Sequence, residues 1–249
     1  MKLCRINCSG DVKFAVYENG VYKEVTNILD NITYTSNVYQ INDVALLSPC
    51  SPSKVVAVGL NYKKHAEEVK IDIPSHPLLF LKPNTTVIGH SDDIVYPDMS
   101  SRVDFEAELG VVISKECKNV TVEQAKDYVL GYTCLNDVTA RDLQKSESQW
   151  TRAKGFDTFC PIGPYIDTAF EPKDKRITAI LNGEVKQDSN INDMVFNVYE
   201  IISFISKIMT LKPFDVIATG TPSGIGPMKK GDEIVIKIDG LEPLKNKVV

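Results

Sequence analysis

The sequence contains little histidine and no closely paired cysteines. Its three histidines are His65, His76 and His90, and none of its six cysteines forms a Cys-x-x-Cys pair. A structural zinc site needs clustered cysteine and histidine ligands, so this composition argues against a zinc finger. We interpret the cysteines as small, buried hydrophobic residues that remain reduced. A mechanism that depends on histidine has only three candidate residues.

The chain also lacks a long apolar run and an excess of basic residues. No stretch reaches the roughly 18 apolar residues of a membrane-spanning helix, and the first residues contain no apolar signal core. We therefore expect a cytoplasmic protein with no membrane partner. The net charge of -5, from 28 basic and 33 acidic residues, argues against a nucleic-acid partner. The chain has 43% hydrophobic and 24% charged residues. This composition excludes disorder, collagen and coiled coil as descriptions of the whole chain.

The 249 residues divide at a linker rich in proline and serine, residues 48–53. Before it, two runs typical of strands, 12–17 and 21–25, flank Asn19-Gly20, which predicts a hairpin. We therefore expect a small β-rich N-terminal domain over residues 1–50. The larger domain is expected over residues 51–249.

The larger part is expected to contain many strands and few helices. Its predicted strands are 55–59, 177–181, 184–186, 215–219 and 233–238, and its predicted helices are a long one over 197–211 and a short one that begins at Thr121. The helices do not alternate regularly with the strands, which argues against a Rossmann fold or a TIM barrel. The predicted fold class is α+β and β-rich.

Acidic residues alternate along the segment 104–113, which ends in apolar, β-branched residues typical of a buried strand. If this segment is one strand, then Asp104, Glu106 and Glu108 share a face. Such carboxylates are either solvated on an edge strand or neutralised by a cation, and oxygen ligands suit Mg²⁺, Mn²⁺ or Ca²⁺. Asp137 follows another predicted strand and is in a position to complete the site.

His65 and Glu68 follow the predicted strand 55–59 and are three residues apart, so they face each other on a helical turn. A carboxylate beside an imidazole fixes its tautomer, as a general base requires. The alternative is a surface ion pair. The next residues, 70–77, are rich in charge and proline, which is compatible with a lid over a site. His76 and His90 are interpreted as surface residues.

The glycine-rich turn 219–227 follows a predicted buried strand. It resembles a phosphate cradle, but it has no Lys-Ser/Thr ending and no helix after it, so a P-loop is not expected. Its hydroxyls and backbone N–H groups could hold a carboxylate. The alternative is a loop without a binding role.

Together these segments resemble the fumarylacetoacetate hydrolase family, in its small bacterial branch of acylpyruvases and 5-carboxymethyl-2-hydroxymuconate isomerases. No single motif is decisive, but the matching segments occur in family order. They are residues 58–62 with His65 and Glu68, 79–83, 104–109, 131–132, 136–144, 150–157, 181–184, 219–226 and 231–232. The first 47 residues resemble the small N-terminal domain of some bacterial members.

The resemblance implies a mixed β-sandwich roll and a set of functional residues. By this resemblance, Glu106, Glu108 and Asp137 hold one divalent cation, Mg²⁺ or Mn²⁺ (Ca²⁺ being possible in crystals), and Asp104 lies outside the ligands. His65 and Glu68 form a catalytic dyad on a lid. The positions that match substrate contacts or catalytic groups are Lys154, Gln144, Thr221 and Lys82. Where related acylpyruvases have Gly-Arg-Asn-Tyr, this chain has Leu60 in place of the arginine. A homodimer is also implied.

The function implied by the resemblance is action on a small 2-oxo acid through a metal-bound enolate. The expected reaction is hydrolysis of a C–C bond in an acylpyruvate or fumarylpyruvate, with His65 as general base and Lys154 as oxyanion stabiliser. Decarboxylation or tautomerisation of oxaloacetate and isomerisation of 5-carboxymethyl-2-hydroxymuconate use the same enolate and stay open. Further alternatives are a sugar-acid dehydratase and a binding module stabilised by a non-catalytic Ca²⁺ site.

Overall fold

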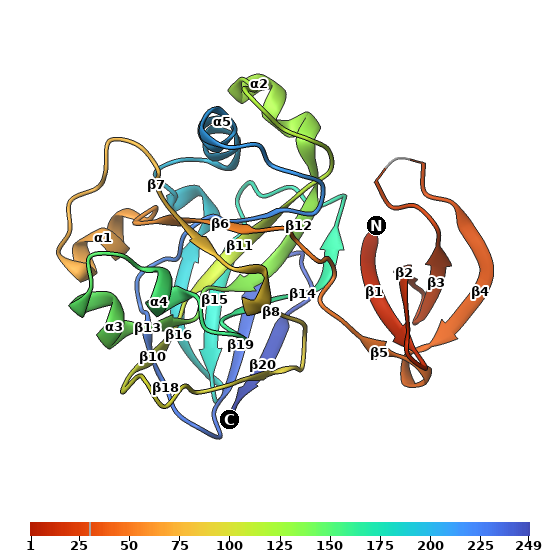
Figure 1. The fold of residues 1–249 in the computed structure, drawn as a ribbon, viewed down its shortest axis with the longest axis horizontal. Helices are drawn as coiled ribbons and strands as arrows, with labels where there is room; N and C mark the ends of the chain where they lie inside the picture. Colours follow the sequence, from red (N-terminus) through yellow and green to blue (C-terminus); the bar gives the residue numbers. More distant parts are fainter. Residues whose placement is uncertain (30) are drawn as a thin grey trace.

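A computed structural model of the protein describes residues 1–29 and 31–249. Its N-terminal strands form an antiparallel meander at one side of the molecule (Figure 1). They are β1 Lys2–Cys8, β2 Asp11–Glu18, β3 Val21–Val25, β4 Tyr34–Gln40 and β5 Ala45–Leu46, with a 3-10 turn at Ile41–Asp43. The predicted hairpin joins β2 to β3, and Asn19 and Gly20 have the positive φ values, 53° and 80°, that a tight hairpin turn requires. A small apolar cluster that includes Ile6 and Tyr22 fills this unit.

The largest sheet runs through both parts of the chain. Its order is β4-β3-β2-β1-β14-β12-β11-β17-β6-β7, with β5 beside β1 and β8 beside β14. The strands that the larger part contributes are β6 Val55–Gly59, β7 Leu78–Lys82, β8 Val87–Ile88, β11 Ala107–Ile113, β12 Val129–Asn136, β14 Cys160–Asp167 and β17 Val216–Ala218. Lys2 and Leu3 of β1 pair with Asp167 and Ile166 of β14. The linker predicted at residues 48–53 therefore does not interrupt the sheet.

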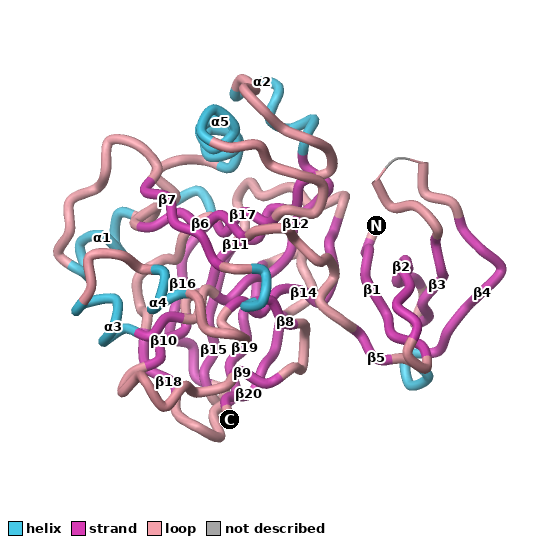
Figure 2. Tube along the Cα trace, in the orientation of Figure 1, coloured by secondary structure: helices cyan, strands magenta, loops and turns pink. Residues whose placement is uncertain are grey.

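Two smaller sheets complete the β structure (Figure 2). One has the order β16-β15-β19-β20-β9 and the other β13-β10-β18. Their strands are β9 Asp93–Ile94, β10 Val103–Phe105, β13 Thr139–Ala140, β15 Arg176–Leu181, β16 Glu184–Asn190, β18 Gly226–Met228, β19 Glu233–Ile238 and β20 Leu244–Val248. The hairpin predicted around Asn182-Gly183 joins β15 to β16. β15 contacts β11, β19 contacts both β11 and β12, and the main apolar core includes residues of all four strands.

The helices are few and short, which confirms the β-rich α+β class. They are α1 Lys63–Val69, α2 Val122–Ala125, α3 Arg141–Ser146, α4 Thr151–Lys154 and α5 Val198–Ile208, with 3-10 turns at Asn84–Thr86, Lys126–Tyr128 and Ile191–Asp193. The capping box predicted at Thr121 is present, with Gln124 as its partner. Among residues 1–29 and 31–249, no helix is long and apolar enough to span a membrane.

The long helix is shorter than predicted. The sequence pattern extends over residues 197–211, but Asn197 is the N-cap of α5, and its side chain accepts the N–H groups of Tyr199 and Glu200. At the other end the backbone becomes extended at Met209, and Leu211 forms a β-bridge with Cys117. The apolar residues after Ile208 therefore belong to a strand-like connection, because their pairing partner lies elsewhere in the sequence.

Candidate active site

The acidic segment is interrupted at Glu106, so the prediction of one continuous strand over residues 104–113 is wrong. β10 pairs with β13 and β18, whereas β11 pairs with β12 and β17. At the break, side-chain amides take the place of the backbone hydrogen bonds between strands. Glu106 N–H donates to Asn136 Oδ1 at 2.9 Å, and Ala107 N–H donates to Gln187 Oε1 at 2.8 Å. The two halves belong to different sheets because each has its own partner strands.

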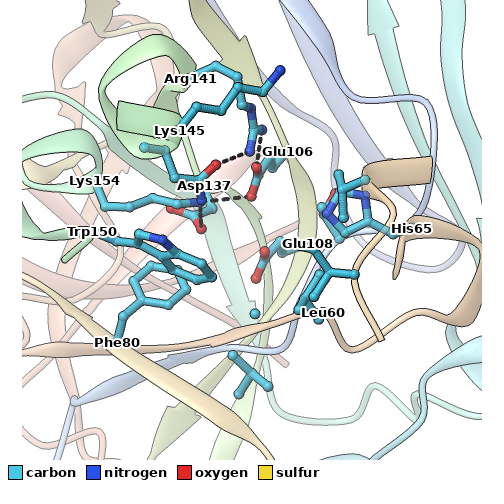
Figure 3. Close-up of a pocket in the computed structure, with 16 residues that line it drawn as sticks. Leu60, His65, Phe80, Glu106, Glu108, Asp137, Arg141, Lys145, Trp150 and Lys154 are labelled. Carbon is cyan, nitrogen blue, oxygen red and sulfur yellow. Dashed lines mark hydrogen bonds and ion pairs between the residues drawn. The ribbon is translucent and has the colours of Figure 1, made fainter. Parts of the chain in front are cut away.

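Three carboxylates gather beside this break, as Figure 3 shows. Glu106, Glu108 and Asp137 each offer one oxygen, and these oxygens lie within 4.8 Å of one another. Asp137 directly follows β12, and its N–H donates to the carbonyl of Glu106 at 2.9 Å. The three residues are buried, with exposed fractions of 4%, 1% and 1%. The alternative of a solvated face on an edge strand is therefore wrong.

Asp104 lies apart from this carboxylate cluster. Its oxygens accept hydrogen bonds from Arg102 Nε and from Arg141 Nε, each at 2.8 Å. Arg141 also donates to Glu106 and to the side chain of Gln144. Asp104 therefore orients Arg141, which in turn contacts the cluster.

Two buried lysines also contact the cluster. Lys154 Nζ lies 2.9 Å from Glu106 Oε2 and 2.6 Å from Asp137 Oδ2. Lys82 Nζ lies 2.5 Å from Asp137 Oδ1 and also donates to the carbonyl of Val138. Both ammonium groups are therefore held by carboxylates.

The three carboxylates have different electrostatic surroundings. Burial by itself raises the pKa of Glu106, but the positive charges of Lys154 and Arg141 outweigh it and lower that pKa below its usual range. Burial, with the charges of Asp137 and Glu106, raises the pKa of Glu108 well above its usual range. Among the described residues Glu108 forms no ion pair, and its hydrogen-bond donor is Gly220 N–H at 2.8 Å. The negative charge of the cluster is thus least compensated at Glu108.

This donor set fits a hard divalent cation. It consists of carboxylate oxygens, which Mg²⁺ and Mn²⁺ prefer, and it is buried, where a charge must be compensated. A dication on Glu106, Glu108 and Asp137 would supply the compensation that Glu108 lacks. No histidine or cysteine belongs to the cluster, which argues against zinc.

His65 and Glu68 form the predicted pair on α1. Nδ1 of His65 lies 3.0 Å from Oε2 of Glu68, and the His65 side chain is 8% exposed. The other Glu68 oxygen accepts the N–H of Gly224 at 3.0 Å. An ionised carboxylate only accepts hydrogen bonds, so this contact places a proton on Nδ1, and Nε2 is the nitrogen that can accept a proton in the neutral imidazole. The pair is buried on its histidine side, unlike an ordinary surface ion pair.

The glycine-rich turn holds two of these carboxylates. Gly220 N–H donates to Glu108, and Gly224 N–H donates to Glu68. Both glycines have positive φ, 100° and 96°, and a Cβ at Gly220 would lie 2.6 Å from Cβ of Asn61. The expectation that backbone N–H groups of this turn can hold a carboxylate is thus met by carboxylates of the protein itself.

A cavity of about 340 Å³ brings the carboxylate cluster and the histidine together. One side of it is polar, and the other is formed by apolar groups that include Leu60, Phe80 and Trp150 (Figure 3). Its lining residues are Val58, Gly59, Leu60, His65, Val69, Ile71, Phe80, Glu106, Glu108, Asp137, Arg141, Gln144, Lys145, Trp150, Lys154 and Thr221. The cavity thus has room for a small organic acid beside a metal site.

Most of the predicted site residues line this cavity. His65, Lys154, Gln144, Thr221, Glu106, Glu108 and Asp137 do so, whereas Glu68 lies behind His65 and Lys82 lies behind Asp137. The segment 70–77 contains no helix or strand, and its Ile71 reaches the cavity.

Sequence reasoning missed Arg141, Lys145 and Gln187. Arg141 had a detectable signal, because it is a basic residue close to Asp137 and Gln144 in a segment whose acidic groups need counter-charges. Lys145 is adjacent to Gln144. Gln187 had no local signal, since it reaches the site from β16, a distant strand of another sheet.

The chain is similar to known proteins over its whole length. The family model described as fumarylacetoacetate (FAA) hydrolase C-terminal matches residues 54–249, and the model described as Rv2993c-like, N-terminal, matches residues 1–49. Oxaloacetate tautomerase Fahd2a from Rattus norvegicus is 40% identical over 220 residues, 84% of this chain and 70% of that protein.

Two solved structures also resemble the chain. The 5-carboxymethyl-2-hydroxymuconate delta-isomerase of Mycobacterium smegmatis is 40% identical, with a TM-score of 0.94 that covers 100% of this chain and 99% of the other. Maleylpyruvate hydrolase of Sphingobium sp. SYK-6, in complex with manganese(II) and pyruvate, is 29% identical, with a TM-score of 0.83 and the same coverage.

Proposed function

The chain belongs to the fumarylacetoacetate hydrolase family. We propose that it is a divalent-cation-dependent enzyme that acts on small 2-oxo acids through an enolate. One observation carries the proposal: the His65–Glu68 pair and the Glu106–Glu108–Asp137 cluster meet at a single cavity. A binding module with a stabilising Ca²⁺ site would need the carboxylates but would have no use for a histidine oriented beside them by Glu68.

The cluster would hold Mg²⁺ or Mn²⁺ through Glu106, Glu108 and Asp137. A divalent cation at this place supplies a Lewis acid for the oxygens of a 2-oxo acid. The Mn²⁺ and pyruvate in the maleylpyruvate hydrolase structure support this combination of metal and substrate class.

The expected reaction is hydrolysis of the C–C bond of an acylpyruvate. His65 takes a proton from water through Nε2, while Glu68 holds Nδ1 and stabilises the positive imidazolium. The hydroxide adds to the distal carbonyl, and the bond between that carbon and the methylene carbon breaks. The products are a carboxylic acid and the enolate of pyruvate, which becomes pyruvate when it takes a proton back from His65. Lys154 lies close enough to the cluster to stabilise negative charge on the substrate.

Tautomerisation of oxaloacetate is the second candidate. Lys154 is already held by two carboxylates, and tautomerisation requires only that the dyad move one proton between carbon and oxygen, with no attacking water. The rat oxaloacetate tautomerase, 40% identical over 84% of this chain, supports this candidate. Double-bond isomerisation uses the same proton transfer, and the M. smegmatis isomerase supports it in the same way.

Lys145 favours substrates that carry a second carboxylate. Its side chain lines the cavity, and among the described residues it has no acidic partner. The other basic residues of the lining, Arg141 and Lys154, are already paired with acids. Oxaloacetate and fumarylpyruvate each have a distal carboxylate that this free ammonium group would attract.

One panel of substrates tests the proposal. Oxaloacetate, acetylpyruvate, fumarylpyruvate and 5-carboxymethyl-2-hydroxymuconate are each incubated with Mg²⁺, with Mn²⁺ and with EDTA, while enol absorbance, pyruvate and CO₂ are followed. Hydrolysis releases pyruvate without CO₂, decarboxylation releases both, and tautomerisation or isomerisation releases neither. We expect turnover that EDTA abolishes.

The variant Glu106→Gln provides the decisive comparison, because it removes one carboxylate of the cluster. Loss of turnover of every substrate in this variant is the expected result. Full activity without the Glu106 carboxylate, or turnover that is insensitive to EDTA, would overturn the proposed function.

A further inference from the structure

Gln187 has a buried side-chain amide that joins the segment of the carboxylate cluster to the glycine-rich turn. It lies on β16, is 0% exposed, and reaches across to the segment that contains Glu106 and Glu108. Its Oε1 accepts the N–H of Ala107, the residue between these two carboxylates, at 2.8 Å. Its Nε2 donates to Thr221 Oγ1 at 2.8 Å and to the carbonyl of Pro222 at 2.7 Å.

These partners leave no freedom in the orientation of the amide. A backbone N–H can only donate and a carbonyl can only accept, so Oε1 must face Ala107 and Nε2 must face Pro222. Both Nε2 protons are then used, one on the Pro222 carbonyl and one on Thr221 Oγ1. A flipped amide would lose the hydrogen bonds to Ala107 and Pro222 and would reverse the one to Thr221.

The fixed orientation of the Gln187 amide constrains the hydroxyl of Thr221, a residue that lines the cavity. Because its oxygen accepts a proton from Gln187, its own hydroxyl proton must point in another direction. The Thr221 side chain is 3% exposed, and the structure gives its hydroxyl proton no acceptor among the described residues. A donor without a partner in a buried place is costly unless a ligand accepts its proton.

We propose that Gln187 is a positioning residue that directs the hydroxyl proton of Thr221 into the cavity, as a hydrogen-bond donor to an oxygen of the 2-oxo acid. The inference rests on the proposed function, because it needs an oxygen-bearing substrate in this cavity. Gln187 itself does not contact the substrate. Through Ala107 it also sets the position of Thr221 relative to the carboxylate cluster.

The test compares four variants of Gln187 and Thr221 and one control variant with the wild type. Gln187→Glu keeps the shape but replaces the donor with an acceptor for the Thr221 proton, and Gln187→Met removes both polar atoms. Thr221→Val removes the hydroxyl, and Thr221→Ser keeps it. Asn246→Asp is the matched control, because Asn246 is a buried amide, 1% exposed, that donates to the carbonyls of Gly89 and Asp92 and does not line the cavity.

Calorimetry measures two affinities for each protein: that of Mn²⁺ alone, and that of pyruvate for the Mn²⁺-loaded protein. KM and kcat for the best substrate of the panel accompany them. We expect Gln187→Glu and Thr221→Val each to weaken pyruvate binding and raise KM by about tenfold, the effect of one hydrogen bond to a charged acceptor. Mn²⁺ affinity and kcat should change much less. Thr221→Ser should restore most of the pyruvate affinity that Thr221→Val loses, because it keeps the hydroxyl. The control Asn246→Asp should bind pyruvate as the wild type does.

The double variant Gln187→Glu/Thr221→Val separates positioning from general support of the fold. If Gln187 acts through the hydroxyl, the double variant binds pyruvate no more weakly than Thr221→Val alone. Additive losses would show a structural role and overturn the inference. So would unchanged pyruvate binding in Thr221→Val, a result that does not depend on whether the Gln187 variants fold.

Failure of the proposed function has a different signature. In that case the wild-type protein neither binds pyruvate in the presence of Mn²⁺ nor turns over any substrate of the panel, and the inference fails with it. If the wild type binds pyruvate and Thr221→Val binds it equally well, the inference fails alone.

Discussion

Nδ1 of His65 lies 3.0 Å from Oε2 of Glu68, and the second oxygen of Glu68 is held by Gly224 N–H. The carboxylate is therefore fixed between a helix and the glycine-rich turn. Its position determines which nitrogen of His65 carries the proton. The orientation of His65, the proposed general base, thus depends on two segments that are distant in the sequence.

Replacement of His65 by Ala is expected to lower kcat by about 100-fold or more, because it removes the proposed general base. Glu68→Gln should lower it by a similar factor, since an amide can donate to Nδ1 and so favour the wrong tautomer. Steady-state kinetics on the best substrate of the panel measures both effects. Mn²⁺ affinity should stay near the wild-type value in both variants.

His76→Ala serves as the matched control for the dyad, since His76 is exposed and does not line the cavity. It should keep wild-type activity. Unchanged kcat in His65→Ala would contradict the catalytic role and favour a non-catalytic cation site.

Glu108→Gln is expected to abolish stabilisation by Mn²⁺ without weakening the metal-free protein. The pKa of Glu108 is raised by burial and by its acidic neighbours, and Glu108 has no ion pair to lose among the described residues. At 100 times its dissociation constant, Mn²⁺ should stabilise the wild type by about 2.7 kcal/mol, or roughly 5 °C in Tm. Thermal melts with and without Mn²⁺ measure the difference. A variant that keeps the full shift would exclude Glu108 as a ligand.

Lys145→Gln is expected to change substrate preference more than catalysis. If the ammonium group attracts a distal carboxylate, KM for fumarylpyruvate should rise by about fivefold, the effect of an exposed ion pair, while KM for acetylpyruvate stays constant. Lys230→Gln, at an exposed lysine outside the cavity lining, should change neither value. Equal changes in both KM values would contradict this role for Lys145.

Asp215 should make the linker between the two parts of the chain sensitive to acid. Its side chain is 0% exposed and accepts hydrogen bonds from Ser53, Lys54 and Lys212. Burial by itself raises its pKa, but these donors outweigh it and lower the pKa below the ordinary value of 3.8. The stability that ionised Asp215 contributes is therefore complete above that value and is lost as the pH falls below it.

Asp215→Asn should accordingly lower the free energy of unfolding by about 3 kcal/mol at neutral pH. The difference from the wild type should shrink as the pH falls below the ordinary value of 3.8. Urea denaturation across this range measures it, with the exposed Asp98→Asn as control. A difference that stays constant with pH would show that the charge of Asp215 does not matter.

Much of this site was predictable because its residues lie in short segments with strong local patterns. His65 and Glu68 are three residues apart on one helix, and the spacing alone predicts their contact. The resemblance to a family then singled out Glu106, Glu108 and Asp137, which the structure brings together. The hairpins at Asn19-Gly20 and Asn182-Gly183 follow from turn chemistry that is equally local.

The break at Glu106 shows where local patterns fail. Alternation predicts that Asp104 points to the same side as Glu106, but each half of the segment pairs with a different sheet. Asp104 therefore lies with Arg102 and Arg141 rather than in the carboxylate cluster. Strand pairing is a property of distant partners, which a local pattern does not contain.

The sequence by itself determined the β-rich class and the helical spacing that brings His65 and Glu68 into contact. Only the tertiary structure decided that the large sheet continues across the linker and that Arg141 and Lys154 partner the carboxylates. It also decided that Gln187 reaches Thr221 from another sheet. The physical reason is that turns, caps and helical spacing act within a few residues, whereas ion pairs and hydrogen bonds between sheets depend on how remote strands pack.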